Sequence, residues 1–135
     1  MNMAELKCVV VTPERTILDK MAQFVALPLF DGEIGIAPGH TPMIGRLGFG
    51  EMRLLGDERI ERYYVEGGFV EVLNDVVSVL TQHATPAAEL DEMAVAEQLA
   101  VARARPANTP DLMAARDRAV ALSRAQLRVA RRALR

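Results

Sequence analysis

Apolar and polar residues alternate with a period of about two up to Gln82, and clusters of Gly, Pro, Asn and Asp interrupt the alternation. Successive side chains of a β-strand point to opposite faces, so this period is typical of strands. The predicted strands are residues 6–10, 24–27, 52–55, 59–65, 69–73 and 76–80. Several short strands at this spacing predict a flattened β-sandwich or barrel.

The clearest predicted hairpin joins residues 69–73 to residues 76–80. Asn74 and Asp75 separate the two strands, and both residue types tolerate the positive φ angles of a tight hairpin turn. Gly56 and Asp57 predict a second hairpin by the same argument. Apolar residues occupy neighbouring positions in both strands of the first hairpin, which predicts a strand layer covered on both faces.

The pattern becomes helical after His83. Residues 85–88 have the composition of a linker, and Asp91 can cap a helix that reaches about Arg105. Residues 106–110 then break the helix with two prolines. A short break between two helices predicts an antiparallel helical hairpin.

Thr109 and Pro110 suit the N-cap and the first position of the second helix. The sequence therefore predicts two domains. An all-β domain, a flattened sandwich or barrel of short strands, is expected over residues 1–86, and an antiparallel α-helical hairpin over residues 87–135.

The second predicted helix separates its arginines from its apolar residues. At 100° per residue, one narrow stripe comprises Arg124, Arg128, Arg131 and Arg135. A seven-residue repeat, resembling a coiled-coil seam, comprises Met113, Val120, Leu127 and Leu134. The face opposite the arginines is mostly alanine, with Leu112 and Leu134. Alanine buries little area at about 25 cal/mol per Å², so we expect weak pairing and a hairpin that can detach.

Charge is unevenly divided along the chain. Residues 110–135 contain seven arginines and two aspartates, although the formal net charge of the whole chain is −2. The arginine stripe therefore has three interpretations: a solvated face, a contact with carboxylates of a protein, or a contact with phosphates of nucleic acid or an anionic membrane. A net acidic chain disfavours nucleic acid, and an alanine-rich apolar side disfavours a membrane-surface helix. An acidic protein partner fits best.

Composition bounds the class of protein further. With 135 residues, 50% of them hydrophobic and only 4% aromatic, the chain can bury an aliphatic core. The single cysteine, Cys8, lies in an apolar alternation and is expected to be a buried structural thiol in a reducing compartment. We expect neither a signal peptide nor direct insertion into a membrane.

Residues 31–42 form the most constrained segment, with three glycines and two prolines in twelve residues. Such a segment predicts a shaped loop, and loops of this kind often carry function. Asp31 and Glu33 suit a catalytic carboxylate pair in principle, but turn capping or a partner contact fits a glycine-rich loop better. His40 suits pH sensing or hydrogen-bond donation, and a fixed loop or interface position better still.

Recognisable catalytic and metal-binding patterns are missing from the sequence. No serine or cysteine adjoins either histidine in a nucleophile–base arrangement, and one cysteine with two distant histidines gives no zinc spacing. Gly67 and Gly68 lack the lysine and spacing of a phosphate-binding loop, so a close backbone approach is expected there. We therefore predict a chain that is not an enzyme and holds no metal or cofactor.

Four segments resemble the family of ε subunits of bacterial F-type ATP synthases, which are called δ in mitochondria. The segments are residues 11–15, 31–42, 66–72 together with 76–80, and 125–129. The resemblance implies a sandwich followed by a helical hairpin, in agreement with the pattern. It also implies a central-stalk subunit that binds the γ subunit and touches the polar loops of the membrane c-ring. Such a subunit is peripheral to the cytoplasmic face of the bacterial plasma membrane.

The resemblance also assigns residues to these roles. The ring contact would fall at Asp31, Glu33 and His40. The hairpin of such subunits lies folded on the sandwich or extends along γ, where its basic helix meets an acidic segment of the catalytic β subunits and inhibits ATP hydrolysis. The candidates for that inhibitory contact are Arg116, Arg124, Arg128, Arg131 and Arg132. The alternative within the family is a purely structural coupling subunit with a permanently folded hairpin.

Some family members bind ATP on the folded hairpin through a pattern of Ile or Leu, Asp, two variable residues, Arg and Ala. Here Leu90 and Asp91 fit the start, but Ala94 and Val95 occupy the Arg-Ala positions. Loss of the guanidinium removes a strong phosphate contact. We therefore expect Asp91 to be a helix cap and regulatory ATP binding to be weak or absent.

Two hypotheses come from other classes of protein. A small β-sandwich hydrolase lacks a catalytic set here, and activity without partner subunits would revive it. A nucleic-acid module would bind an RNA or DNA oligomer in a salt-dependent manner.

Overall fold

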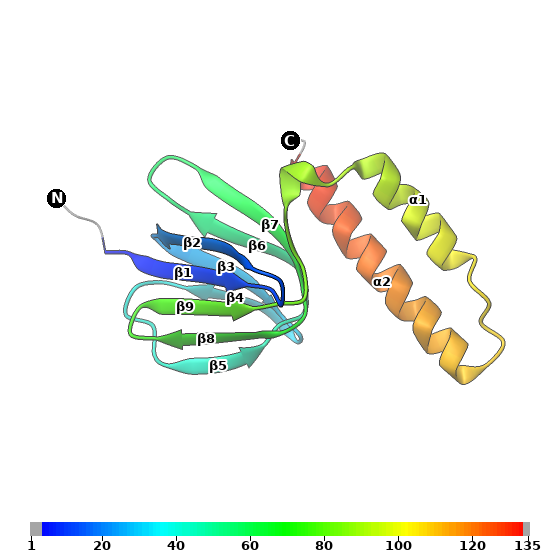
Figure 1. The fold of residues 1–135 in the computed structure, drawn as a ribbon, viewed down its shortest axis with the longest axis horizontal. Coiled ribbons are helices and arrows are strands. Elements are labelled where there is room, and N and C mark those ends of the chain that lie inside the picture. Colours follow the sequence, from blue (N-terminus) through cyan, green and yellow to red (C-terminus); the bar gives the residue numbers. More distant parts are fainter. Residues whose placement is uncertain (1–3, 134–135) are drawn as a thin grey trace. The chain divides into compact units, whose positions relative to one another are not determined.

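The computed structural model describes residues 4–133. The chain divides into two compact units between Pro86 and Ala87. Within the described residues, the first unit contains ten strands, and the second contains a short 3₁₀ helix and two α-helices (Figure 1). This architecture confirms the predicted sandwich and helical hairpin.

The strands form two stacked five-stranded sheets (Figure 1). The first sheet has the order β2 (Thr16–Ala22), β1 (Leu6–Val11), β9 (Val76–Leu80), β8 (Phe69–Leu73) and β5 (Met43–Arg46). The second has the order β10 (Ala84–Pro86), β7 (Ile60–Glu66), β6 (Phe49–Leu55), β3 (Phe24–Leu29) and β4 (Gly32–Ile36). Strands β1 and β9 pair in parallel, and the other named pairs are antiparallel.

The core between the sheets is aliphatic. Strand β1 alternates as predicted, because Leu6, Cys8 and Val10 are fully buried. They pack with Val25, Leu27, Ile36, Met52, Leu54, Val65, Val70, Val72, Val77 and Val79. Each fully buried side chain of this size contributes about 1.5–3 kcal/mol. The interior site of Cys8 confirms the prediction of a structural thiol.

The β8–β9 hairpin is confirmed. Asn74 and Asp75 have φ angles of 50° and 61°, which the two-residue turn requires. The expectation that this layer is covered on both faces is wrong, since β8 buries Val70 and Val72 but leaves Phe69 and Leu73 exposed. Its alternation is regular, and the exposed positions simply carry apolar side chains.

Strands β2, β4 and β5 were not predicted from the sequence pattern. Glycine has low strand propensity, so the glycine-rich segment was expected to be a loop. Gly35 nevertheless lies within β4, where it pairs with Ala26 and where the absence of a Cβ leaves room for the ring of Phe24. Pro28 lies inside β3, beyond the end of the β3–β6 ladder at Ala26, where its missing N–H is tolerated.

The predicted linker over residues 85–88 is also incorrect. Strand β10 pairs with β7 through Ala84, Thr85 and Pro86. The 3₁₀ helix η1 (Ala87–Glu89) follows at once, and Ala87 is 2% exposed. The connection is therefore ordered secondary structure.

The helical unit contains α1 (Glu92–Arg103) and α2 (Pro110–Ala133). Both predicted caps are confirmed: Asp91 accepts hydrogen bonds at the start of α1, and Thr109 Oγ1 accepts from the Leu112 amide at 3.1 Å. The two helices are antiparallel and lie side by side in Figure 1.

The apolar cluster between the two helices is small. It comprises Val95, Leu99 and Leu127, with Val120 at its margin. Val120 and Leu127 belong to the predicted seven-residue repeat, whereas Leu112 from the predicted apolar face is 41% exposed. Leu134 and Arg135 lie outside the described residues. The cluster is much smaller than the sandwich core, in line with the expected weak pairing.

Candidate functional site

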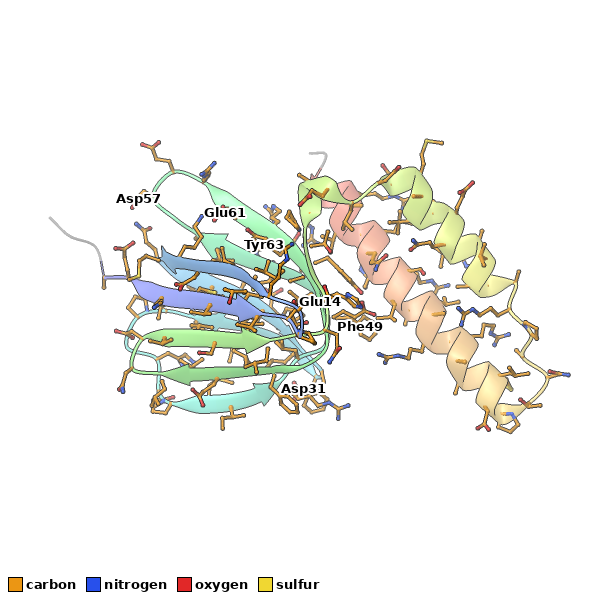
Figure 2. The ribbon with its side chains drawn as sticks, viewed as in Figure 1. Glu14, Asp31, Phe49, Asp57, Glu61 and Tyr63 are labelled. Atoms are coloured by element: carbon orange, nitrogen blue, oxygen red, sulfur yellow. The ribbon has the colours of Figure 1, made fainter. Side chains whose placement is uncertain are left out.

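Asp31, Glu33 and His40 follow one edge of the second sheet. Strand β4 is the terminal strand of that sheet and pairs only with β3 among the described strands. Asp31 precedes β4, Glu33 lies within it, and His40 follows it. A strand of this length spans about 17 Å, so Asp31 and His40 lie near its opposite ends and do not form one cluster. Figure 2 shows Asp31 at one end of the sandwich and Asp57 at the other.

Glu33 is held by an arginine of strand β6. Arg53 Nη2 donates to Glu33 Oε1 at 2.7 Å, and Arg53 Nη1 lies 3.4 Å from Glu33 Oε2. The same Nη1 donates to Glu51 Oε1 at 3.2 Å. The hydrogen bond to Glu33 raises the pKa of Arg53 above its ordinary value, with Glu51 adding to the effect and partial burial opposing it.

Glu51 connects this pair to strand β7. Its side chain is 5% exposed, and Oε1 also accepts a hydrogen bond from Arg62 Nη1 at 3.0 Å. Arg53 and Arg62 face each other across the β6–β7 ladder. Glu51 therefore offsets a repulsion between two opposed cations, and four side chains form one ion-pair network across the sheet.

The loop that carries His40 is tied down by the β8–β9 turn. The amide of Gly39 donates to Asp75 Oδ1 at 2.7 Å, and the amide of His40 donates to the Ala37 carbonyl at 3.1 Å. His40 Nδ1 lies 2.7 Å from the carbonyl oxygen of Thr41, so Nδ1 carries the proton in this bond. The half-buried ring is thus fixed, as expected for a loop residue.

Sequence reasoning missed the partners that hold this edge. Arg53, Glu51 and Arg62 carry no motif, and Arg53 is twenty residues from Glu33 along the chain. Asp75 was predicted only as a turn residue. The order β4–β3–β6–β7 brings the three charged side chains to Glu33, and Asp75 comes from the β8–β9 turn of the other sheet. The one signal in the sequence was the placement of charges within otherwise apolar strands.

The first sheet presents an apolar outer face that was also not predicted. We define it by four exposed side chains, which are Ile44, Phe69, Leu73 and Leu80. Phe69 lies opposite Leu80 in the β8–β9 ladder. A shallow groove beside it is lined by Pro42, Met43, Ile44, Glu71, Val72 and Leu73. Large apolar side chains exposed on one sheet face are typical of an interaction site.

The predicted inhibitory arginines differ in their surroundings. Arg124, Arg128, Arg131 and Arg132 are exposed, and Arg116 is half-buried. Arg131 Nε donates to Glu92 Oε1 at 2.8 Å, and Arg116 pairs with the adjacent Asp117 at 3.2 Å. Within residues 4–133, Arg124 and Arg128 have no ion-pair partner. The arginine stripe is therefore partly engaged by α1 and partly open.

Asp91 and Ala94 lie at the start of α1. Asp91 Oδ1 accepts hydrogen bonds from the amides of Met93 at 3.0 Å and Ala94 at 3.3 Å. Val95 points into the cluster between the helices and is 4% exposed. This part of the helix supplies no cationic side chain for a phosphate. Among the described residues, no group of three or more His, Cys, Asp or Glu side chains is placed to hold a metal ion.

None of the helices described over residues 4–133 has the length and apolar character needed to cross a bilayer.

Two solved structures share the fold. A chain of the Euglena gracilis mitochondrial ATP synthase (OSCP/F1/c-ring, rotational state 1) matches with a TM-score of 0.80 and 24% identity, covering 100% of this chain and 85% of that one. A chain of the Tetrahymena thermophila mitochondrial ATP synthase (central stalk/c-ring) matches with a TM-score of 0.67 and 13% identity, covering 94% and 99%. At these identities, the likeness shows the fold alone.

Sequence relatives give the family. Residues 5–87 match the family described as ATP synthase, Delta/Epsilon chain, beta-sandwich domain. The ATP synthase epsilon chain of Rhodopirellula baltica is 52% identical over 126 residues, covering 93% of this chain and 98% of that relative. The ATP synthase epsilon chain of Bordetella avium is 40% identical over 133 residues, covering 96% and 94%. This chain therefore belongs to the ATP synthase δ/ε chain family, whose members are non-catalytic subunits of that complex.

Proposed function

We propose that this chain is a central-stalk subunit of a bacterial F-type ATP synthase. Its sandwich couples the catalytic head to the membrane ring, and its basic C-terminal helix inhibits ATP hydrolysis. The subunit is peripheral and acts at the cytoplasmic face of the membrane. Family membership supports the assignment to the complex, and the surfaces described above support the individual contacts.

The apolar outer face suits the γ subunit. Ile44 and Phe69 are 75% and 58% exposed, which is costly for side chains of this size in water. A subunit that rotates with the stalk needs a lasting contact with it, and apolar area that is buried on assembly supplies one. We therefore assign the γ contact to this face of the first sheet.

The β4 edge suits the polar loops of the c-ring. Asp31, Glu33 and His40 present polar groups along it, and the Gly39–Asp75 and Arg53–Glu33 hydrogen bonds hold its backbone and side chains in place. A contact that transmits torque requires groups whose positions do not yield. The β4 edge therefore combines polar groups suited to the c-ring loops with fixed positions for those groups.

The observation that carries the inhibitory role is the state of Arg124 and Arg128. Both are exposed on α2, and neither has an ion-pair partner within residues 4–133. A guanidinium group binds carboxylates through a planar fork, so an acidic segment of the catalytic β subunits is the natural partner. Arg131 and Arg132 extend this surface by one turn, and Arg116 lies two turns before it.

A second candidate is a permanently folded hairpin without inhibitory action. The ion pair between Arg131 and Glu92 favours it, because it ties the end of α2 to the start of α1. In that case the arginine stripe is only a solvated face. The two functions differ in whether the helical unit affects ATP hydrolysis.

Regulatory ATP binding is not part of the proposed function. The Asp91 carboxylate is committed to the α1 N-cap, and Ala94 cannot contact a phosphate through a side-chain donor. Calorimetric titration with ATP should detect no sub-millimolar binding. Binding in that range would show that the hairpin holds the nucleotide by other residues.

Titration of a catalytic head lacking this subunit tests whether the helical unit, and not the sandwich, inhibits ATP hydrolysis. ATP hydrolysis is measured while the full chain, or a version that stops at Ala88, is added. Inhibition by the full chain alone supports the proposed role of the helical unit. Equal inhibition by both versions places the effect in the sandwich, and no inhibition by either, with binding intact, favours the folded structural subunit.

A further inference from the structure

We infer that Arg53 is a positioning residue, which fixes the Glu33 carboxylate on the β4 edge for its contact with the membrane ring. The inference rests on the proposed ring contact of Glu33. Arg53 itself lies on β6, two strands away from β4 in the second sheet, and is separated from the edge by β3. It therefore acts through Glu33.

Both terminal nitrogens of the Arg53 guanidinium group donate hydrogen bonds to carboxylates. Nη2 is committed to Glu33 at 2.7 Å, while Nη1 is shared between Glu33 at 3.4 Å and Glu51 at 3.2 Å. A planar guanidinium held at two carboxylates has little rotational freedom. A lysine at this position would supply a point charge but could not bridge both groups in a fixed orientation.

Glu51 supplies the fixed end of this arrangement. Its side chain is almost completely buried, and it accepts from Arg62 as well as from Arg53. Arg62 is on β7, so the anchor spans two strands that are paired over their whole length. The buried end of the network is thus rigid. Because Arg53 is hydrogen-bonded to this buried end, it restrains the Glu33 side chain to which it also donates.

Glu33 needs such support. Its side chain is 54% exposed and lies on an edge strand, where an unrestrained glutamate samples several rotamers. Holding it in one rotamer before the contact forms removes that ordering cost from binding. The same hydrogen bonds connect the edge strand to the centre of the sheet, so a load on Glu33 is shared by β6 and β7.

A network that only stabilised the sheet would behave differently. Its loss would lower the melting temperature without changing how the assembled enzyme couples hydrolysis to ion transport. The test therefore needs a coupling readout as well as a stability readout, and a control that removes an ion pair elsewhere. Lys20 of β2, in the other sheet, offers that control because its ion pair with Glu61 of β7 involves none of the four network side chains.

The experiment compares the variants E33Q, R53Q, R53K, K20Q and the double variant E33Q/R53Q in the assembled synthase. The ratio of ions transported to ATP hydrolysed is measured, with thermal unfolding of each isolated chain beside it. We expect E33Q and R53Q to lower the coupling ratio by similar factors of about two to five. The double variant should be no worse than either single variant, R53K should be intermediate, and K20Q should match the wild type.

Two results would overturn the inference while leaving the ring contact intact. One is normal coupling in R53Q together with a loss of coupling in E33Q. The other is a double variant whose fold-loss of coupling equals the product of the two single-variant losses, because independent residues contribute additively in free energy. Normal coupling in E33Q would instead remove the proposed ring contact itself. Equal melting-temperature shifts in R53Q and K20Q, with only R53Q uncoupled, would support the positioning role.

Discussion

Gly68 and Gly39 both have a positive φ, but the structure requires glycine at the two positions to different degrees. The φ angles are 103° and 85°. A Cβ at Gly68 would clash with the carbonyl oxygen of Leu80, whereas a Cβ at Gly39 would meet no atom within 4 Å. One position is therefore restricted by a close backbone approach and the other only by its dihedral angle.

This difference predicts a ranking of two alanine variants. Gly39→Ala should lower the free energy of unfolding by about 1–2 kcal/mol, the cost of a left-handed residue. Gly68→Ala should cost more than about 3 kcal/mol, because the clash adds to the strain. Urea denaturation of the two variants measures both values, and equal losses would contradict the close approach between Gly68 and Leu80.

Cys8 gives a second prediction at the residue scale, on the pH dependence of stability. Burial, with a smaller contribution from the Asp19 carboxylate, raises the pKa of the Cys8 thiol from 9.0 to about 12. The unfolded chain therefore loses this proton first as the pH rises. The stabilisation is complete below about pH 9 and is lost between about pH 9 and pH 12, with a slope of up to about 1.4 kcal/mol per pH unit.

Comparison with Cys8→Ala isolates this contribution from other groups that titrate in the alkaline range. Denaturation curves from pH 8 upward should converge for the two proteins as the pH increases. A constant difference between them at all pH values would show that the thiol is accessible to solvent in the folded state.

Single residues were predictable where their role is local. The caps Asp91 and Thr109 follow from side chains next to a helix start, and the buried Cys8 follows from its alternating neighbours. Arg53 was not predictable, because its partner Glu33 is distant in sequence. Such a pair becomes visible only when the strand order is known.

The same limit applies to whole elements. The β8–β9 hairpin was predictable from its turn residues and its two apolar runs, and the structure contains the hairpin at the predicted residues. Strand β4 has two glycines among its five residues, which outweigh the strand preference of Ile34 and Ile36, so local preference pointed to a loop. Pairing with β3 and the packing of Gly35 against Phe24 outweigh that preference.

The helical unit gives a prediction at the element scale. Glu92 forms an ion pair with Arg131 in the folded hairpin, so it competes with any external carboxylate for the Arg131 guanidinium group. Glu92→Gln should therefore raise the inhibitory affinity of the chain for the catalytic head by about two- to fivefold, within the range of an exposed ion pair. Glu97→Gln removes the same charge from an exposed position of α1 that has no ion pair among residues 4–133, and it should have no effect. Equal effects of both variants would indicate a general charge effect.

At the scale of the whole molecule, the two units are built differently. The sandwich has a continuous aliphatic core, whereas the apolar cluster between the helices, within residues 4–133, comprises Val95, Leu99 and Leu127 with Val120 at its margin. The basic charge is gathered in the last helix of a chain whose net charge is −2. Composition and periodicity predicted this division, because both are properties of long segments and do not depend on distant pairing.

The proposed function follows the same division, with a rigid coupling unit and a weakly packed basic unit. Its central claim is that the open arginines of α2 inhibit ATP hydrolysis. The claim concerns positions on the helix rather than charge alone. A decisive measurement must therefore change position while keeping the number of charges constant.

ATP hydrolysis by a catalytic head without this subunit should be titrated with the wild type, with R124Q/R128Q and with R105Q/R118Q. All four arginines are exposed, but Arg105 and Arg118 lie outside the arginine stripe. We expect R124Q/R128Q to lose most of the inhibition while still binding the head, and R105Q/R118Q to inhibit like the wild type. Full inhibition by R124Q/R128Q, or equal losses in both variants, would contradict the account.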